Sequence, residues 1–116
     1  MIRLKDSSVQ LLILRPEMWL IFDDISTAFK LMGYECVLTC GTNAHGPDDP
    51  HTHGFALDFR SKHIRTSDEK HALLEMLRRE LNVKHANFYT VLLENEGVAN
   101  EHFHIQVKKG IWRDLI

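Results

Sequence analysis

Four of the eight histidines lie in two short segments that are far apart along the chain. The first, residues 51–58, reads His-Thr-His-Gly-Phe-Ala-Leu-Asp, and the second, residues 101–104, reads Glu-His-Phe-His. Both mix imidazole and carboxylate groups with apolar residues, as in β-strands that bury one face and keep the other polar. A fold for this chain therefore has to place two strands together with their polar faces on the same side of a sheet.

The first segment has the pattern of a strand entered through a tight turn. A strand over residues 55–60 places Asp58 and Ala56 on one face and the apolar residues between them on the other. Gly54 suits a turn or the close approach of another chain segment. Such a turn folds His51 back toward Asp58.

The second segment belongs to a predicted β-hairpin. Residues 88–93 indicate one strand, residues 95–97 (Asn-Glu-Gly) a turn, and residues 102–108 the return strand. The polar residues of the return strand share one face: His102, His104 and Gln106.

Two helices are predicted in the remaining sequence. Apolar residues at helical spacing indicate a helix over residues 16–32, opened by proline and stopped by Gly33. A capping box at residues 66–69 begins a second helix, which is expected to end near Asn82.

With a further strand over residues 35–39, these elements predict an α+β fold. We expect one domain over residues 1–116, with a small, mostly antiparallel sheet and helices packed on one face. The polar strand positions, and with them the candidate site, then lie on the other face.

The polar residues match the chemistry of a catalytic zinc ion. Such an ion usually takes three protein ligands from His and Asp or Glu and leaves a position for water. His51, Asp58 and His104 would supply this set, and Glu101 is a candidate general base. Zn²⁺ is therefore the expected cofactor.

The pattern His-x₆-Asp with Gly and Ala between, followed by Glu-x-x-His, resembles the M15 zinc peptidases. These include D-alanyl-D-alanine carboxypeptidases and phage L-alanyl-D-glutamate endolysins, and their metal-binding fold occurs in the hedgehog signalling domain. The resemblance covers residues 36–108. It implies that His51, Asp58 and His104 bind zinc, that Glu101 is the general base, and that His102 supports the oxyanion. It also implies hydrolysis of a peptide bond involving a D-amino acid in peptidoglycan, so that peptidoglycan stem peptides are the expected partner.

Two positions depart from the family pattern. The family often has Ser two residues before the first histidine and an upstream Arg for the substrate carboxylate, whereas this chain has Asp49 and residues 41–43 (Gly-Thr-Asn). Arg60 is the nearest replacement cation for substrate binding, because guanidinium binds carboxylates bidentately. In a regular strand Glu101 would face away from His104, three residues on, which leaves Glu94 as the second candidate for the base.

The remaining histidines and the two cysteines receive lesser roles. His53 is expected to line the mouth of the site, and His45 lies in a loop that would pass close to the metal. The histidines outside both segments are expected to be surface residues: His63, His71 and His85. Cys36 and Cys40 would lie on the same strand face about 13 Å apart, too far for a disulfide, so we expect reduced, buried thiols, with Cys40 a lesser candidate ligand.

Charge and hydropathy exclude some functions. A formal charge of -2 gives no basic stripe for nucleic acid, and no segment is apolar enough for a membrane span. The first residues lack a signal-peptide pattern, so we expect synthesis in the cytoplasm. We also expect the protein to be a monomer. Release by a holin, by lysis or in a virion would then bring it to the wall.

Two alternatives remain open. The same site could hold zinc in a non-catalytic recognition module, such as a phage structural protein, which the missing upstream Arg favours. The other is a metallo-β-lactamase or amidohydrolase site that begins at residues 51–53, although those folds need a longer chain.

Overall fold

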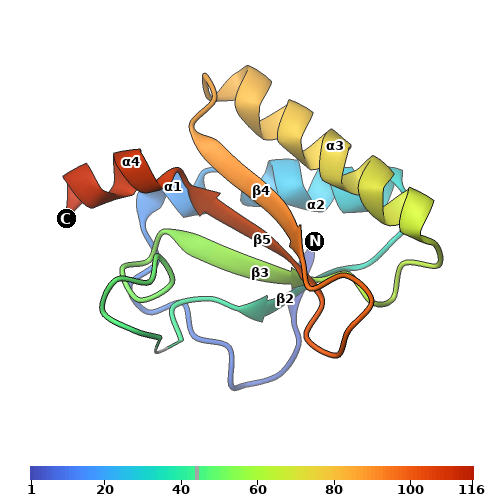
Figure 1. The fold of residues 1–116 in the computed structure, drawn as a ribbon, viewed down its shortest axis with the longest axis horizontal. Helices are drawn as coiled ribbons and strands as arrows, with labels where there is room; N and C mark the ends of the chain where they lie inside the picture. The colour runs from blue at the N-terminus through green and yellow to red at the C-terminus, as the bar shows by residue number, and fades with distance from the viewer. Residues whose placement is uncertain (44) are drawn as a thin grey trace.

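A five-stranded sheet with the order β1-β2-β3-β5-β4 runs through the computed structural model, which describes residues 1–43 and 45–116 (Figure 1). β1 and β2 are parallel, and the other neighbours are antiparallel. The strands are β1 (Ile2–Leu4), β2 (Cys36–Cys40), β3 (Ala56–Arg60), β4 (Tyr89–Glu94) and β5 (His102–Val107). The predicted α+β class with a mostly antiparallel sheet is confirmed. β1 was not predicted, because three partly exposed residues carry no periodic signal.

The helices pack against one face of the sheet. α2 and α3 lie side by side there, α2 against β2 and α3 against β4 (Figure 1). The helical elements are α1 (Pro16–Trp19), α2 (Phe22–Leu31), α3 (Ser67–Lys84), α4 (Lys109–Trp112) and a final 3₁₀ turn, Arg113–Leu115. Among the described residues, none of the helices combines the length and the apolarity needed to cross a bilayer.

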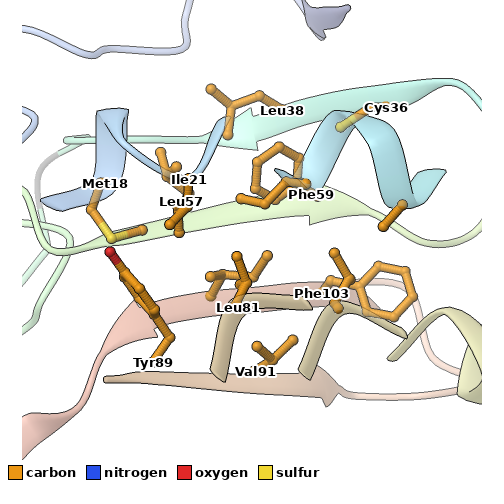
Figure 2. Close-up of a cluster of buried hydrophobic side chains, with 14 of the residues drawn as sticks. Met18, Ile21, Cys36, Leu38, Leu57, Phe59, Leu81, Tyr89, Val91 and Phe103 are labelled. Carbon is orange, nitrogen blue, oxygen red and sulfur yellow. The ribbon is translucent and has the colours of Figure 1, made fainter. Parts of the chain in front are cut away.

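The core fills the space between the helices and this face of the sheet. Figure 2 shows Leu57 and Phe59 of β3 and Phe103 of β5 in the same buried cluster as Leu81 of α3 and Ile21. These side chains are fully buried. The alternation predicted for residues 55–60 and 102–108 is confirmed, because the apolar positions of both strands belong to this core and leave Asp58 and His104 for the other face.

The predicted helix over residues 16–32 is interrupted between α1 and α2. The Tyr89 hydroxyl donates to the Glu17 carbonyl at 2.5 Å, which is the oxygen that the Ile21 amide would use in a continuous helix. The Ile21 amide bonds to Met18 instead, at 3.4 Å. The predicted start at Pro16 and the stop at Gly33, with φ +81°, are confirmed.

The second predicted helix is α3. The Thr66 side chain accepts from the Glu69 amide at 3.1 Å, so the N-cap is confirmed. The Glu69 carboxylate bonds to Tyr34 and lies 3.6 Å from Arg65. The helix continues to Lys84, two residues past the predicted end.

A β-bulge in β2 corrects the prediction for the two cysteines. Leu38 lies opposite Phe59 and Cys40 opposite Asp58, so two steps along β2 match one step along β3. The extra residue turns Cys40 onto the face that carries Asp58, while Cys36 stays buried in the core. The two thiols therefore lie on opposite faces of the sheet.

Residues 10–15 pass close to Gly41 and Gly54, at either end of the loop before β3. The Thr42 amide donates to the Gln10 carbonyl at 2.6 Å, and the Arg15 amide donates to the Gly54 carbonyl at 3.0 Å. A Cβ on Gly54 would lie 2.2 Å from the Ile13 carbonyl oxygen, and its φ is +80°. The expected close approach of a second chain segment at Gly54 is confirmed.

Gly54→Ala should lower the free energy of unfolding by about 2–4 kcal/mol, because a side chain there is crowded against backbone and strained by the positive φ. Urea unfolding of the purified variant measures this. Gly46→Ala is the matched control, since a Cβ on Gly46 meets nothing within 4 Å and its φ lies outside the left-handed range. Equal losses in the two variants would contradict this explanation.

Candidate metal centre

The pairing of β3 with β5 builds the centre of the site. Asp58 lies directly opposite His104, and two residues further along β3 Arg60 lies opposite His102. β4 adds Glu94 opposite His102 on the far side of β5. Because opposite residues share a face, Asp58, His104, His102 and Glu94 all lie on the face away from the core.

His51 reaches the same face from the loop before β3. The Asp49 carboxylate accepts from the His51 amide at 2.9 Å, as in an Asx-type turn, and the Pro50 carbonyl accepts from the Phe55 amide at 2.9 Å. This turn folds the loop back over the start of β3. The His51 ring is buried, with only 4% of its side chain exposed, and its Nε2 lies 3.2 Å from Asp58 Oδ1.

Imidazole nitrogens converge on one oxygen of Asp58. His104 Nδ1 lies 2.9 Å and His102 Nε2 3.7 Å from Asp58 Oδ1, in addition to His51 Nε2. Ligand atoms on a tetrahedral zinc ion lie about 3.3 Å apart, given bond lengths near 2.0–2.1 Å. The distances from Asp58 Oδ1 to His51 Nε2 and to His104 Nδ1 are therefore close to the separation of two ligand atoms on a small cation.

Hydrogen bonds hold the two buried rings in orientation. His51 Nδ1 lies 2.7 Å from the Gly41 carbonyl oxygen, and His104 Nε2 lies 2.8 Å from Gln106 Oε1. When these nitrogens donate, the lone pair of each neutral ring points toward Asp58, as a metal ligand requires. The role of Gln106 was not predicted, although its place on the His102–His104 face was.

Charge coupling within the cluster is strong. Burial alone would lower the pKa of His51, but hydrogen bonds with Asp58 and Cys40 raise it to about 10. Burial alone would raise the pKa of Asp58, but hydrogen bonds from His104 and His51 lower it well below its usual range. Protons on the imidazoles thus balance the carboxylate before a cation binds. A metal ion would displace them, so its affinity should rise with pH.

Glu94 lies beside the converging ligands. Its Oε1 is 3.0 Å from His102 Nε2 and 3.7 Å from His104 Nδ1. Ligand atoms of Asp58, Glu94, His102 and His104 all lie within 4.8 Å of one another, and those of Cys40, His45 and His51 form a second such group. Both groups could bind a metal ion.

Glu101 does not lie with these groups, so the prediction that it stands beside the metal ligands is wrong. It precedes β5, and its side chain is only 2% exposed. Its carboxylate accepts from the Ser61 hydroxyl, from Lys70 Nζ at 2.9 Å and from the Gly97 amide at 3.0 Å. Glu101 thus fastens the β4–β5 loop to α3.

A pocket of about 360 Å³ opens over the cluster. The residues that line it are His45, Asp49, Pro50, His51, Asp58, Glu94, His102, His104 and Gln106. The His45 ring stacks on the His51 ring with centroids 4.6 Å apart, which agrees with the predicted position of the His45 loop near the metal ligands. Asp49 was not predicted to line the site.

Two predicted substrate-binding residues lie outside this pocket. His53 Nε2 lies 2.6 Å from the Pro47 carbonyl oxygen, and its ring stacks on Trp112, so it joins the loop to the C-terminal helix α4. Arg60 lies on the same face of β3 as Asp58, two residues further along the strand. Neither residue lines the pocket.

The other three histidines contact residues away from the cluster. His63 Nε2 lies 2.7 Å from the Glu35 carbonyl oxygen, and His71 Nε2 lies 2.8 Å from Glu96. His85 Nε2 lies 3.5 Å from Asp24. His71 is the exposed member, as predicted, whereas His63 and His85 are half-buried.

Glu101→Gln should destabilise the fold at neutral pH by about 2–3 kcal/mol. Burial alone would raise the pKa of Glu101, but hydrogen bonds from Ser61, Gly97 and Lys70 lower it from 4.5 to about 2. A carboxyl group with a lowered pKa stabilises the folded state at pH values above its pKa in the unfolded chain. This stabilisation is lost as the pH falls through its pKa in the folded protein. The difference from the unsubstituted protein, measured by urea unfolding, should be half lost near pH ~3.

The control for this experiment is Glu80→Gln, which removes a charge from an exposed pair with Lys84. It should change the free energy of unfolding by less than about 0.5 kcal/mol at any pH. A Glu101→Gln effect that stays constant between neutral pH and pH ~3 would show that its charge does not cause the stabilisation.

Comparison with protein-family models, curated proteins and solved structures finds no match for this chain. The resemblance to the M15 zinc peptidases therefore stays a prediction from the two sequence motifs. What the site does is inferred from its own residues and geometry.

Proposed function

We propose that this protein is a zinc-dependent peptidase that hydrolyses a peptide bond involving a D-amino acid in peptidoglycan. The observation that carries the proposal is the convergence of His51 and His104 on Asp58, with Glu94 3.7 Å from His104. The residues come from a loop and three strands that are distant in sequence. Because these polar residues gather on the face away from the core, we infer that they serve a function and do not merely pack the fold.

The donor set favours zinc. Two imidazoles and one carboxylate are the ligands of many catalytic zinc sites, which leave one position open. When bound there, zinc would acidify a water molecule and polarise the carbonyl of a substrate. His51, Asp58 and His104 would hold it, and the pocket beside them gives a substrate access.

Glu94 replaces Glu101 as our candidate for the general base. It lines the pocket and lies beside the ligand group, whereas both oxygens of Glu101 bond to residues elsewhere. Its carboxylate can accept a proton from an attacking water and pass it to the leaving amine. His102, 3.0 Å away, holds this carboxylate in place.

His102 is placed to serve in a second way. Its Nδ1 lies 2.6 Å from the Asn100 carbonyl oxygen and its Nε2 3.0 Å from Glu94, and both partners are acceptors. The ring donates to both when it is in its charged form. A charged ring at the pocket wall would also stabilise an oxyanion as the substrate carbonyl is attacked.

The substrate class in this proposal comes from the motif resemblance and is compatible with the pocket. The lining is polar, and a volume of about 360 Å³ accommodates a short peptide segment. In this proposal the partner is a peptidoglycan stem peptide and the role resembles that of a phage endolysin.

A non-catalytic zinc module is the second candidate. The observation that favours it is the lack of a cation for a substrate carboxylate, since no Lys or Arg among residues 1–43 and 45–116 lines the pocket. Such a module would bind one zinc ion and leave peptidoglycan peptides uncut. Zinc content and cleavage, measured on one sample, separate the two candidates.

Glu94→Gln should lower the rate of hydrolysis by about 10²–10⁴-fold, because it removes a general base while keeping the shape of the side chain. Mass spectrometry of soluble peptidoglycan fragments measures the products, and elemental analysis should still find one zinc ion per chain. Glu101→Gln, assayed at neutral pH where it remains folded, is the matched control and should keep nearly full activity. The reverse pattern, with Glu94→Gln active and Glu101→Gln inactive, would overturn the choice of base.

Zinc should raise the thermal midpoint of the metal-free protein. A concentration of 100 times Kd stabilises the folded state by about 2.7 kcal/mol, or roughly 10 °C for a domain of this size. His51→Ala should lose most of this shift in a thermal unfolding scan, while His71→Ala, outside the cluster, should keep it. An unchanged shift in His51→Ala would exclude His51 as a ligand.

A further inference from the structure

Cys40 lies beside Nδ1 of the His51 ring, whereas Nε2 of that ring faces Asp58. Its Sγ lies 3.8 Å from His51 Nδ1, and ligand atoms of Cys40, His45 and His51 lie within 4.8 Å of one another. We propose that these three residues form a second metal site, which takes a thiophilic cation such as Cd²⁺ or Cu⁺ and competes with the zinc centre for His51.

The distances suit a shared ion. A thiolate sulfur and an imidazole nitrogen on one tetrahedral zinc-like ion lie about 3.5 Å apart, given bonds near 2.3 and 2.0–2.1 Å. The 3.8 Å between Cys40 and His51 needs only a small movement. His45 Nδ1 lies 2.7 Å from the Asn43 carbonyl oxygen, which leaves its Nε2 for a cation.

The β-bulge is what puts a thiol at this place. In a regular strand Cys40 would share the core face with Leu38, two residues earlier. The bulge between them sets Cys40 opposite Asp58 instead, on the face of the metal centre. Bulges often re-aim a side chain beside a functional site, and Cys36, which precedes the bulge, stays in the core.

The residue types determine the class of cation. A thiolate with imidazoles selects thiophilic ions, whereas the carboxylate-containing set at Asp58 suits harder ones. His45 is exposed and Cys40 is half-buried, so an ion can enter from solvent. The two groups are separate sets of ligand atoms, and His51 is the residue between them.

Occupation of the two sites is mutually exclusive because a neutral imidazole has one lone pair. In the zinc centre, His51 donates from Nδ1 to the Gly41 carbonyl and offers Nε2 toward Asp58. In the second site Nδ1 would bind the cation, and Nε2 would carry the proton and donate to Asp58. A thiophilic ion therefore removes His51 from the zinc ligands and lowers zinc affinity.

Cd²⁺ titration of the reduced, metal-free protein tests the site, with the ultraviolet charge-transfer absorption of a Cd²⁺–thiolate bond as the readout. The unsubstituted protein and Cys36→Ala should both reach a plateau that corresponds to one thiolate per chain. Cys40→Ala should show no such absorption. His104→Ala, which lacks a zinc-centre ligand, should keep it, while His45→Ala should need about tenfold more Cd²⁺.

A second measurement tests the competition. Zinc-loaded protein is dialysed against increasing Cd²⁺, and zinc retained by the chain is measured by elemental analysis. Cys40→Ala should need about tenfold more Cd²⁺ than the unsubstituted protein or Cys36→Ala to release half of its zinc. The proposal is overturned if the thiolate absorption is missing from the unsubstituted protein or survives in Cys40→Ala. It is also overturned if Cys40→Ala releases its zinc at the same Cd²⁺ concentration as the unsubstituted protein.

Discussion

The antiparallel pairing of β3 with β5 is the interaction on which the rest of the structure depends. It places Asp58 opposite His104 on one face and joins Phe59 to Phe103 on the other. The same register therefore closes the apolar core and brings Asp58 and His104 of the candidate metal centre together. A slip of one residue would exchange the two faces and destroy both, so the core selects the register that the site requires.

The candidate metal centre gathers ionisable groups in a largely buried place. Asp58 is largely buried beside two buried imidazoles, and burial opposes the charged form of each group. His51 Nδ1 and His104 Nε2 donate to the Gly41 carbonyl and to Gln106 Oε1, and these hydrogen bonds fix the orientation of the two rings. Without a cation, protons on the imidazoles compensate the charge of Asp58. A metal ion would replace these protons, which makes a cation site the simplest explanation of the arrangement.

Local patterns in the sequence predicted the parts of the fold that local forces decide. The alternation in residues 55–60 and 102–108 gave the correct faces for Asp58, His102 and His104, and Thr66 gave the start of α3. The parts that failed depend on contacts between distant residues. The break between α1 and α2 accompanies a hydrogen bond from Tyr89, and Arg60 does not line the pocket over the cluster.

The two glutamates show the same limit within the site. Glu101 is close to His104 in sequence, but it precedes the strand and is drawn to Lys70 and Ser61. Glu94 is ten residues from His104, yet the hairpin brings it beside the ligands. Cys40 was placed on the wrong face because no residue pattern reveals a bulge whose partner strand is distant. Sequence spacing alone therefore predicted the convergence of His51 and His104 on Asp58, but not which glutamate lies beside them.

X-ray absorption at the zinc edge, on protein loaded with one equivalent of zinc, tests the central claim most directly. If His51, Asp58 and His104 hold the ion, the nearest shell contains only nitrogen and oxygen at about 2.0–2.1 Å, with the outer-shell scattering of two imidazoles. A sulfur neighbour at about 2.3 Å, or a shell without imidazole scattering, would contradict the assignment of this centre.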